Sequence, residues 1–291
     1  MTNDKMKNEH LIELIHLIIN NPLEFGVDSP IYKHWLKELP EIINAMYKKD
    51  PEGKFDLGPI GKIQLPFVDF GSITSAELFG LDEIILFVFY WKNRNRYKIA
   101  FDLGGNIGLH SIMLAKFGLT VNTFEPDPKH IEILENNLEL NDSNLVTLHP
   151  MAVYSDDQER EFVRVLGNTT GSHIAGAKDN PYGQLDRLKV KCRSFRSILL
   201  EKPSLIKMDI EGAEAEVICS IEKGDWGNTD MMMEVGTYAN AEKIWRHLSA
   251  INLNMFAQKI GWQKVNSLED LPNSYKEGSL FLTTKSNIPW I

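Results

Sequence analysis

The sequence predicts an α/β protein with a mostly parallel sheet that is covered by helices on both faces. Three observations support this prediction. From residue 97 onward, apolar strand patterns alternate with helical patterns, a glycine-rich turn follows the first strand, and acidic residues stand where several strands end. Alternation of this kind is typical of crossover connections, which align the strands in parallel and place helices on either side.

The chain is expected to divide into an N-terminal accessory region, residues 1–95, and a main domain, residues 96–291. In the accessory region we expect helices near 7–20 and 31–48, and a strand or hairpin arm at 62–70. The apolar run 84–91 fits a helix or a strand, because periodicity does not separate the two in a run of this kind. The region is predicted to be a mostly helical cap on the main domain. It could instead cover a substrate site or form a homo-oligomer interface.

Seven strands and four helices are expected in the main domain. The strands are predicted at 98–103, 120–124, 145–149, 204–208, 230–235, 253–258 and 279–284, and the helices at 107–117, 128–140, 211–222 and 240–250. In open sheets of this type the ligand lies beyond the carboxyl ends of the strands. Those ends carry acids at Asp102, Glu125, Asp209 and Glu234.

Composition limits the classes of partner and compartment. The chain has 291 residues, 43% of them hydrophobic, and a formal net charge of -9, which disfavours a nucleic-acid substrate. Two cysteines form no disulfide framework, so a reduced, cytoplasmic protein is expected. The apolar stretch 11–19 is short and contains Glu13 and His16, so we expect neither a membrane span nor a signal peptide.

The glycine turn predicts the kind of ligand. Asp102-Leu103-Gly104-Gly105-Asn106-Ile107-Gly108 does not fit the G-x-G-x-x-G dinucleotide pattern, because Asn106 stands where the second glycine belongs. Glycines let backbone N–H groups approach a ligand closely, and Asn tolerates positive φ. An acid before the turn suits an ammonium group better than a pyrophosphate. S-adenosylmethionine carries such an ammonium group and is the cofactor we expect.

The next strand end predicts the rest of the cofactor site. Glu125 lies about twenty residues past the turn, where an acid accepts hydrogen bonds from ribose hydroxyls. Pro126 follows it, and Asp127 is expected to cap the next helix. After the third strand, backbone groups near Ala152 are placed to contact the adenine edge.

These residues also carry a family resemblance. The blocks at 101–108, 124–127, 151–153 and 206–214 resemble the FkbM family of S-adenosylmethionine-dependent methyltransferases, over about half of the chain. The resemblance implies a Rossmann-like, seven-stranded methyltransferase sheet and methyl transfer, usually to a hydroxyl oxygen. Gly105 stands where the family more often has alanine. Ser194 to Ser197 replace an acid pair that family members often carry, so no role is carried over to them.

Acceptor chemistry is expected at the end of the fourth strand. Asp209 is the best-placed general base, and Lys207 shares its face of the strand because side chains alternate. Lys207 could stabilise a developing alkoxide, or form a structural ion pair with Asp209. Glu211 either takes part in catalysis or complements the dipole of the following helix.

Two further residues are candidates at this end of the site. Glu234, at the end of the fifth strand, adds a carboxylate near Asp209. We do not expect a divalent metal, but one would be bound by Asp209 and Glu234. The segment 167–184 is predicted to be a mobile loop or lid, and His173 within it is an alternative base.

The sequence therefore predicts a methyltransferase that uses S-adenosylmethionine, most simply for O-methylation of a hydroxyl on a small molecule, sugar or glycan. Two alternatives stay open. A nicotinamide-dependent oxidoreductase is disfavoured by the missing second glycine. A non-catalytic binding protein is disfavoured by the acids at 102, 125 and 209.

Overall fold

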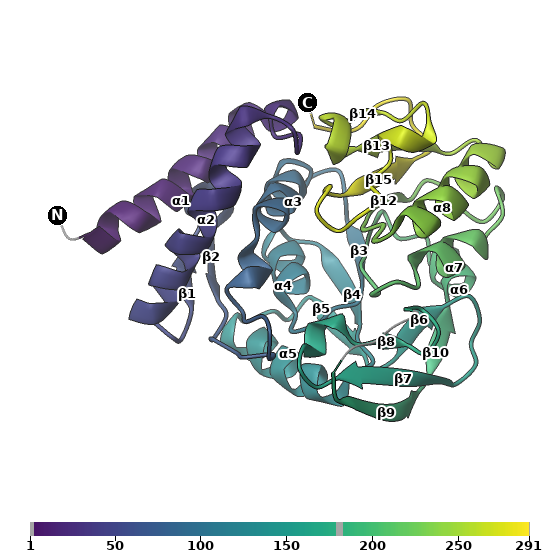
Figure 1. Ribbon diagram of the computed structural model, residues 1–291, viewed down its shortest axis with the longest axis horizontal. Coiled ribbons are helices and arrows are strands. Elements are labelled where there is room, and N and C mark those ends of the chain that lie inside the picture. The colour runs from purple at the N-terminus through teal and green to yellow at the C-terminus, as the bar shows by residue number, and fades with distance from the viewer. Residues whose placement is uncertain (1–2, 179–182, 291) are drawn as a thin grey trace.

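An eight-stranded mixed sheet forms the centre of the molecule in the computed structural model, which describes residues 3–178 and 183–290 (Figure 1). The strand order is β14-β13-β15-β12-β11-β3-β4-β5. The strands are β3 (Ile99–Leu103), β4 (Thr120–Phe124), β5 (Val146–His149), β11 (Leu205–Met208), β12 (Asp230–Met233), β13 (Asn254–Ala257), β14 (Gln263–Lys264) and β15 (Leu280–Thr283).

Five of these strands run parallel, from β5 through β4, β3 and β11 to β12. β15 is antiparallel to both of its neighbours, β12 and β13. The seven strands predicted from sequence are all present, and the short edge strand β14 is the additional one. From β3 the chain adds β4 and β5 on one side, and later β11 and β12 on the other side, so the direction of the connections reverses between β3 and β11. Ligands bind at such a switch point in open α/β sheets.

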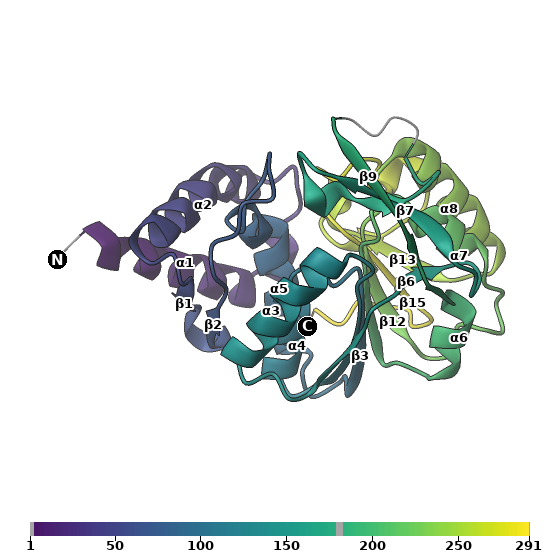
Figure 2. The same ribbon diagram turned by 90° about the horizontal axis from the view of Figure 1, so that it is seen from below.

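Five helices cover the main sheet within the residues from 96 onward that the structure describes. They are α4 (Leu109–Lys116), α5 (Pro128–Leu140), α6 (Phe195–Leu200), α7 (Glu214–Cys219) and α8 (Tyr238–Ala250). Figure 2 shows α4 and α5 on one face of the sheet and α6, α7 and α8 on the other. The expected helix at 211–222 is shorter than predicted, because residues 211 and 212 form a turn with positive φ at both positions.

Alternate strand residues enter two separate apolar cores. Ala100 and Leu205 join a core with α1 to α4, whereas Phe101 and Ile206 join a core with α6, α7 and α8. This alternation follows from the opposite directions of successive side chains in a strand. Both faces of the sheet are therefore buried, as the near-continuous apolar strands predict.

The accessory region is mostly helical, as expected. It contains α1 (Asn3–Asn20), α2 (Pro30–Lys49) and α3 (Leu81–Lys92), with a small hairpin of β1 (Lys54–Asp56) and β2 (Lys62–Gln64). The ambiguous run 84–91 lies in α3, whose middle is buried on all sides, and this explains why its sequence shows no periodicity. The predicted strand at 62–70 is confirmed only for its first three residues.

A second group of short strands lies over the carboxyl end of the main sheet. β7 (Arg160–Val165) pairs with β8 (His173–Ile174) and with β9 (Leu185–Val190), and β6 (Ala152–Tyr154) pairs with β10 (Cys192–Ser194). We name β7, β8 and β9 the cap sheet. The loop predicted at 167–184 therefore contains one strand of this sheet, and its residues 179–182 lie outside the described part of the chain.

Six 3-10 helices complete the secondary structure of the described residues: η1 (Pro22–Glu24), η2 (Gly58–Ile60), η3 (Glu77–Phe79), η4 (Thr169–Gly171), η5 (Gln258–Ile260) and η6 (Leu268–Asp270). None of the helices in residues 3–178 and 183–290 combines the length and the apolarity needed to cross a bilayer.

Candidate active site

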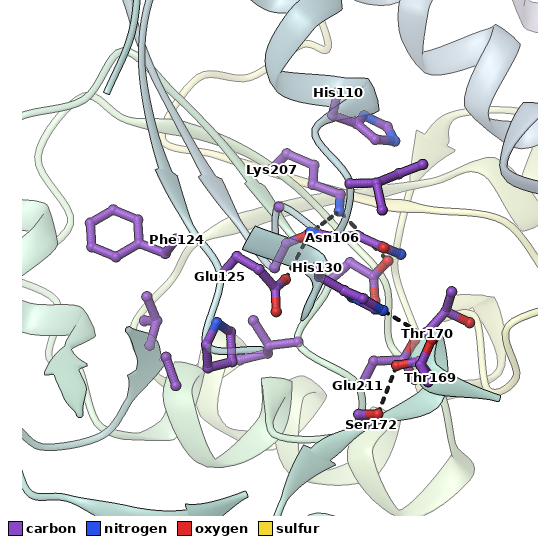
Figure 3. A pocket seen from close by; sticks show the side chains of 18 of the residues that line it. Asn106, His110, Phe124, Glu125, His130, Thr169, Thr170, Ser172, Lys207 and Glu211 are labelled. Carbon is purple, nitrogen blue, oxygen red and sulfur yellow. Dashed lines mark hydrogen bonds and ion pairs between the residues drawn. The ribbon is translucent and has the colours of Figure 1, made fainter. Parts of the chain in front are cut away.

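A cavity of about 880 Å³, including its open mouth, lies at the carboxyl ends of β3, β4 and β11. We name it the donor pocket. Six of the eight residues predicted to bind the cofactor line it: Gly104, Gly105, Asn106, Glu125, Pro126 and Ala152. In Figure 3, His110 and Lys207 lie at one end of this pocket, and Thr169, Thr170 and Ser172 lie at the other.

The glycine turn requires glycine at Gly104 for two reasons. Its φ is +86°, and a Cβ there would lie 1.8 Å from the backbone oxygen of Asp209. The N–H groups of Gly104 and Gly105 both donate to the carbonyl of Phe124, at 3.0 and 2.9 Å. The turn is therefore fixed to the strand ends on either side. Asn106 has φ 49°, in agreement with the tolerance of asparagine for this conformation.

Gly108 lies outside the pocket wall. With φ +91° it begins α4, and a Cβ at this position would approach Leu134 to 3.1 Å. Its direct contact with a cofactor stays a prediction, and its structural role is to let α4 pack against α5.

Glu125 connects the turn to the second strand end. Its Oε2 accepts from the N–H of Asn106 and its Oε1 from the N–H of Asp127, both at 2.8 Å. Burial raises the pKa of this carboxyl to about 8, although the two N–H groups act in the opposite direction. A buried carboxylate oxygen can accept more than one hydrogen bond, so Glu125 can still accept from ligand hydroxyls in the pocket.

Asp102 lies beneath the pocket and not in its wall. The side chain is fully buried, Ser111 Oγ donates to its Oδ2 at 2.5 Å, and Lys207 Nζ lies 3.8 Å from its Oδ1. Lys207 is thus the cation that faces this acid. The predicted contact between Asp102 and a ligand ammonium group stays a prediction.

Lys207 and Asp209 both line the pocket, as their shared strand face predicts. Lys207 Nζ lies 3.6 Å from Asp209 Oδ2 and donates to the carbonyl of Gly104 at 3.3 Å. Burial alone would lower the pKa of Lys207, but Asp209 and Asp102 hold it well above the usual range of lysine. The ammonium group therefore stays charged although only 7% of the residue is exposed.

Glu211 also faces the pocket, from a backbone position with φ 58°. Lys178 Nζ lies 2.6 Å from its Oε2. Burial and the nearby Asp209 raise the pKa of Glu211 to about 7, against the opposing effect of Lys178. Glu211 lies three residues before α7, which begins at Glu214, so it is not in the first turn of that helix, and its part in catalysis stays a prediction.

Two candidates lie outside the donor pocket. Glu234 lines a second cavity beside Asp209, and burial and that neighbouring carboxylate raise its pKa to about 9. His173 lies on β8, is buried, and has its Nδ1 3.0 Å from the carbonyl oxygen of Gly171. A role of His173 as a base stays a prediction that its position does not support.

Several pocket residues were not predicted as site residues. His110, which the helical pattern suggests is a packing residue, lines the pocket with Nε2 2.6 Å from Glu83 Oε2 and Nδ1 3.1 Å from the hydroxyl of Tyr90. His130 Nε2 lies 3.0 Å from Thr169 Oγ1. This contact connects α5 to η4, the 3-10 helix between β7 and β8 of the cap sheet. In the sequence, Glu83 is visible only as an acid at the start of an apolar run. That position does not predict its contact with His110.

A divalent metal bound by Asp209 and Glu234 is the less favoured expectation from the sequence. Within the described ranges, no group of three or more His, Cys, Asp or Glu residues is arranged to hold a metal ion. Asp209 and Glu234 line the same second cavity, but with the other acids of its described lining they do not form such a group.

The sheet order and the glycine turn at the switch point define a Rossmann-like α/β fold with a ligand pocket at the position typical of such sheets. Residues 102–259 match the family described as the Methyltransferase FkbM domain, and the chain belongs to this family. The match begins at Asp102 and includes every candidate residue described above from the glycine turn to Glu234.

One curated relative is Methyltransferase 1 of Beauveria bassiana (strain ARSEF 2860), 26% identical over 152 residues. The matched part covers 44% of this chain and 60% of that protein's length.

Among solved structures, the chain is similar to a precorrin-6y C5,15-methyltransferase from Geobacter metallireducens GS-15, with 11% identity and a TM-score of 0.37 over 67% of this chain and 86% of that one. It is also similar to a ribosomal protein L11 methylase from Lactobacillus delbrueckii subsp. bulgaricus, with 13% identity and a TM-score of 0.38 over 70% and 78%. Similarities this low carry no argument about the reaction of this chain.

Proposed function

We propose that the protein is an S-adenosylmethionine-dependent O-methyltransferase that acts on a hydroxyl of a small molecule, sugar or glycan in the cytoplasm. The observation that carries the proposal is one pocket with two chemically different ends. Glu125 faces the pocket from the end of β4, the donor end, and the ion pair of Lys207 and Asp209 faces it from the end of β11, the acceptor end, with the glycine turn after β3 between them.

The residues at the first end fit the cofactor. Gly104 lets the turn lie close against the Asp209 backbone in the pocket wall, and the buried Glu125 has oxygen lone pairs for ribose hydroxyls. Ala152, Phe162 and Ile174 supply an apolar wall where an adenine ring would pack. The N–H of Ala152 already donates to the carbonyl of Lys191, so adenine would contact its side chain and not this N–H. When bound, S-adenosylmethionine supplies a methyl group activated by a sulfonium.

The residues at the second end fit the acceptor chemistry. Asp209 has one carboxylate oxygen 3.6 Å from Lys207 Nζ and stands at a strand end, where a hydroxyl can reach it. Asp209 removes the hydroxyl proton, and the buried Lys207 ammonium stabilises the negative charge that develops on the oxygen. The family resemblance favours a sugar or secondary-metabolite hydroxyl as acceptor.

Titration calorimetry with S-adenosylhomocysteine tests the donor end. We expect micromolar binding by the wild type, and binding about 10 to 100 times weaker by Glu125→Gln, because a charge-assisted hydrogen bond contributes about 1.5–3 kcal/mol. The affinity of the wild type should rise from pH 6 to about pH 9 and level off above, since the ionised carboxylate accepts the ribose protons and its pKa is about 8.

Glu132→Gln, on the exposed side of α5, is the matched control and should bind like the wild type. A folded wild type that does not bind S-adenosylhomocysteine would refute the proposal. Nicotinamide cofactors would be tested next.

Asp209→Asn tests the acceptor end. We expect it to keep its affinity for S-adenosylhomocysteine and to lose about 10²- to 10⁴-fold in turnover, which is the usual contribution of a general base. Glu216→Gln, exposed on α7, is the control. Unchanged turnover of Asp209→Asn in a methyl-transfer assay would show that this residue is not the base.

A further inference from the structure

A second cavity of about 460 Å³, including its mouth, adjoins the donor pocket. It is lined by the first turn of α3, the ends of β11 and β12, and residues 275–279. Glu83, Lys207 and Asp209 line both cavities. These three charged side chains therefore form a shared wall, and the place where the two cavities meet is the place where a group could pass from one ligand to another.

The ammonium group of Lys207 in this wall can donate further hydrogen bonds. Lys207 is more than nine-tenths buried, and the one hydrogen bond that its Nζ makes within the described residues goes to the Gly104 carbonyl. The carboxylates of Asp209 and Asp102 lie 3.6 and 3.8 Å away, beyond hydrogen-bond distance. An ammonium group has three donors, so Lys207 can donate to an oxygen atom placed in the second cavity.

The rest of the lining is acidic and apolar. It includes four carboxylates, from Asp82, Glu83, Asp209 and Glu234, and Lys207 is the one cation among the described lining residues. Apolar surface comes from Leu86, Met208, Met232 and Met233.

Two of these carboxylates come from the accessory region and are held by buried partners. Asp82 accepts from the hydroxyl of Tyr32 at 3.0 Å and from Gln258 Nε2 at 2.5 Å. Glu83 contacts His110 at 2.6 Å. These contacts fix the positions of both acids in the cavity wall.

We propose that this second cavity, the acceptor chamber, binds an uncharged hydroxyl-bearing molecule and excludes molecules that carry a phosphate or carboxylate group. A hydroxyl can accept from Lys207 and donate to a carboxylate of the shared wall at the same time. Because its raised pKa of about 9 keeps Glu234 protonated near neutral pH, an anion would face the carboxylates of Asp82, Glu83 and Asp209 and a single cation in a confined space, which is unfavourable. The inference rests on the proposed function and adds to it the class of acceptor and the contribution of α3.

Thiol labelling tests the charge selection without a known acceptor. Ser279→Cys places a thiol of similar size in the chamber wall, and the exposed Cys219 is an internal reference on the same chain, whereas Cys192 is buried. The protein is treated with a neutral, a cationic and an anionic methanethiosulfonate reagent of similar size, and the rate at each thiol is followed by peptide mass spectrometry. The anionic-to-neutral rate ratio at the introduced thiol should be at least about tenfold lower than at Cys219.

Glu83→Gln in the Ser279→Cys background should bring that ratio at least threefold closer to the Cys219 value, because it removes one charge of the wall. Tyr275→Cys, at the exposed mouth of the chamber, is used in the same way if Ser279→Cys does not fold. A ratio equal to that of Cys219, or an introduced thiol that reacts with none of the reagents, would overturn the proposal.

Binding of S-adenosylhomocysteine separates the two hypotheses. It is measured before and after labelling. Affinity that stays within about threefold after labelling supports a chamber distinct from the donor pocket, and a larger loss overturns that distinction. Absence of binding by the unlabelled wild type would refute the proposed function, whereas normal binding with no charge selection would refute only the acceptor chamber.

Discussion

Gly104 is the residue on which the shape of the donor pocket depends most directly. It has to adopt a positive φ and to approach the backbone of the neighbouring strand end at Asp209. A side chain would oppose both requirements, since the left-handed conformation is unfavourable for most residues and the clash is with backbone, which does not move aside.

Gly104→Ala is expected to lower the free energy of unfolding by more than about 3 kcal/mol and to abolish binding of S-adenosylhomocysteine. Gly118→Ala separates the two causes, because Gly118 has φ +88° but no atom within 4 Å of the added Cβ. It should cost only about 1 kcal/mol. Urea unfolding of both variants measures the difference. Equal losses would show that the close approach to Asp209 does not matter.

For single residues, the sequence predicted the face of the strand on which a side chain lies better than it predicted contacts between distant side chains. The alternation rule correctly placed Lys207 and Asp209 on one face, because it depends only on the local geometry of a strand. It could not show that Lys207 also faces Asp102, which is 105 positions away from it in the chain, on the neighbouring strand. Nor could it show that His173 would be buried by pairing with Val163. Both contacts are produced by strand pairing between distant segments.

Among the elements, α5 and the cap sheet are joined by a buried ion pair. Asp127 caps α5, as predicted, by accepting from the N–H of Lys129, and Arg164 on β7 donates to the same carboxylate at 2.8 and 2.5 Å. Both side chains are nearly inaccessible. One carboxylate therefore fixes the start of the helix after Glu125 and the sheet that covers the pocket.

Arg164→Ala should destabilise the protein by about 3–5 kcal/mol, because it leaves the buried Asp127 carboxylate without its cation. Hydrogen exchange of residues 160–174 should increase, which would show that the cap sheet loosens. Arg187→Ala is the control, since its ion pair with Glu161 joins β9 to β7 within the same cap sheet and is half-exposed, and it should cost at most about 1 kcal/mol. Similar effects of the two substitutions would contradict the role given to Asp127.

Long, strongly patterned elements were predictable and short ones were not. α5 and β4 have the predicted bounds, since a helical period or an apolar run bounded by turn residues is a local signal. β6, β8 and β10 have two or three residues each, and their strand character exists only through their partners. A segment rich in glycine and threonine was therefore predicted to be a loop.

For the whole molecule, buried acids make stability depend on pH. Burial first, and neighbouring carboxylates second, raise the pKa of Glu125 to about 8 and of Glu234 to about 9. Between their unfolded values near 4.5 and these folded values, the folded state holds protons that the unfolded state has lost. The free energy of unfolding therefore falls as pH rises through this window and stops falling above about pH 9.

Histidines with lowered pKa values, such as His130, have the opposite effect, but only up to about pH 6.5. Thermal unfolding between pH 7 and pH 9 isolates the acids. We expect a loss of about 1 kcal/mol per pH unit, and a smaller slope for Glu125→Gln. Stability that is constant over this range would contradict the raised pKa values.

The N-terminal region also acts at this scale. Its helices share one apolar core with β3, β4, β11 and β12. Two backbone hydrogen bonds also connect it to the segment between β7 and β8 of the cap sheet. The N–H of Ser72 donates to the carbonyl of Gly167, and the N–H of Thr169 donates to the carbonyl of Phe70. The division at residue 95 stays a prediction. The apolar core contains residues from both sides of this position, and contacts between such distant residues could not be predicted from the sequence. Composition indicated the helices but not the sheet face that they cover.

Phe89 of α3 packs against Trp290, with the ring centroids 5.0 Å apart. Asn93, at the end of the same helix, donates its side-chain N–H to the carbonyl of Pro289, 196 positions later. During synthesis, α3 emerges from the ribosome long before these partners exist. Much of its apolar surface can pack early against α1, α2 and α4, but the part that faces Trp290 stays in contact with water or with a chaperone until that residue has been translated. The accessory region therefore completes its packing only after Pro289 and Trp290 have been synthesised, and a nascent chain stalled before Trp290 should be prone to aggregation.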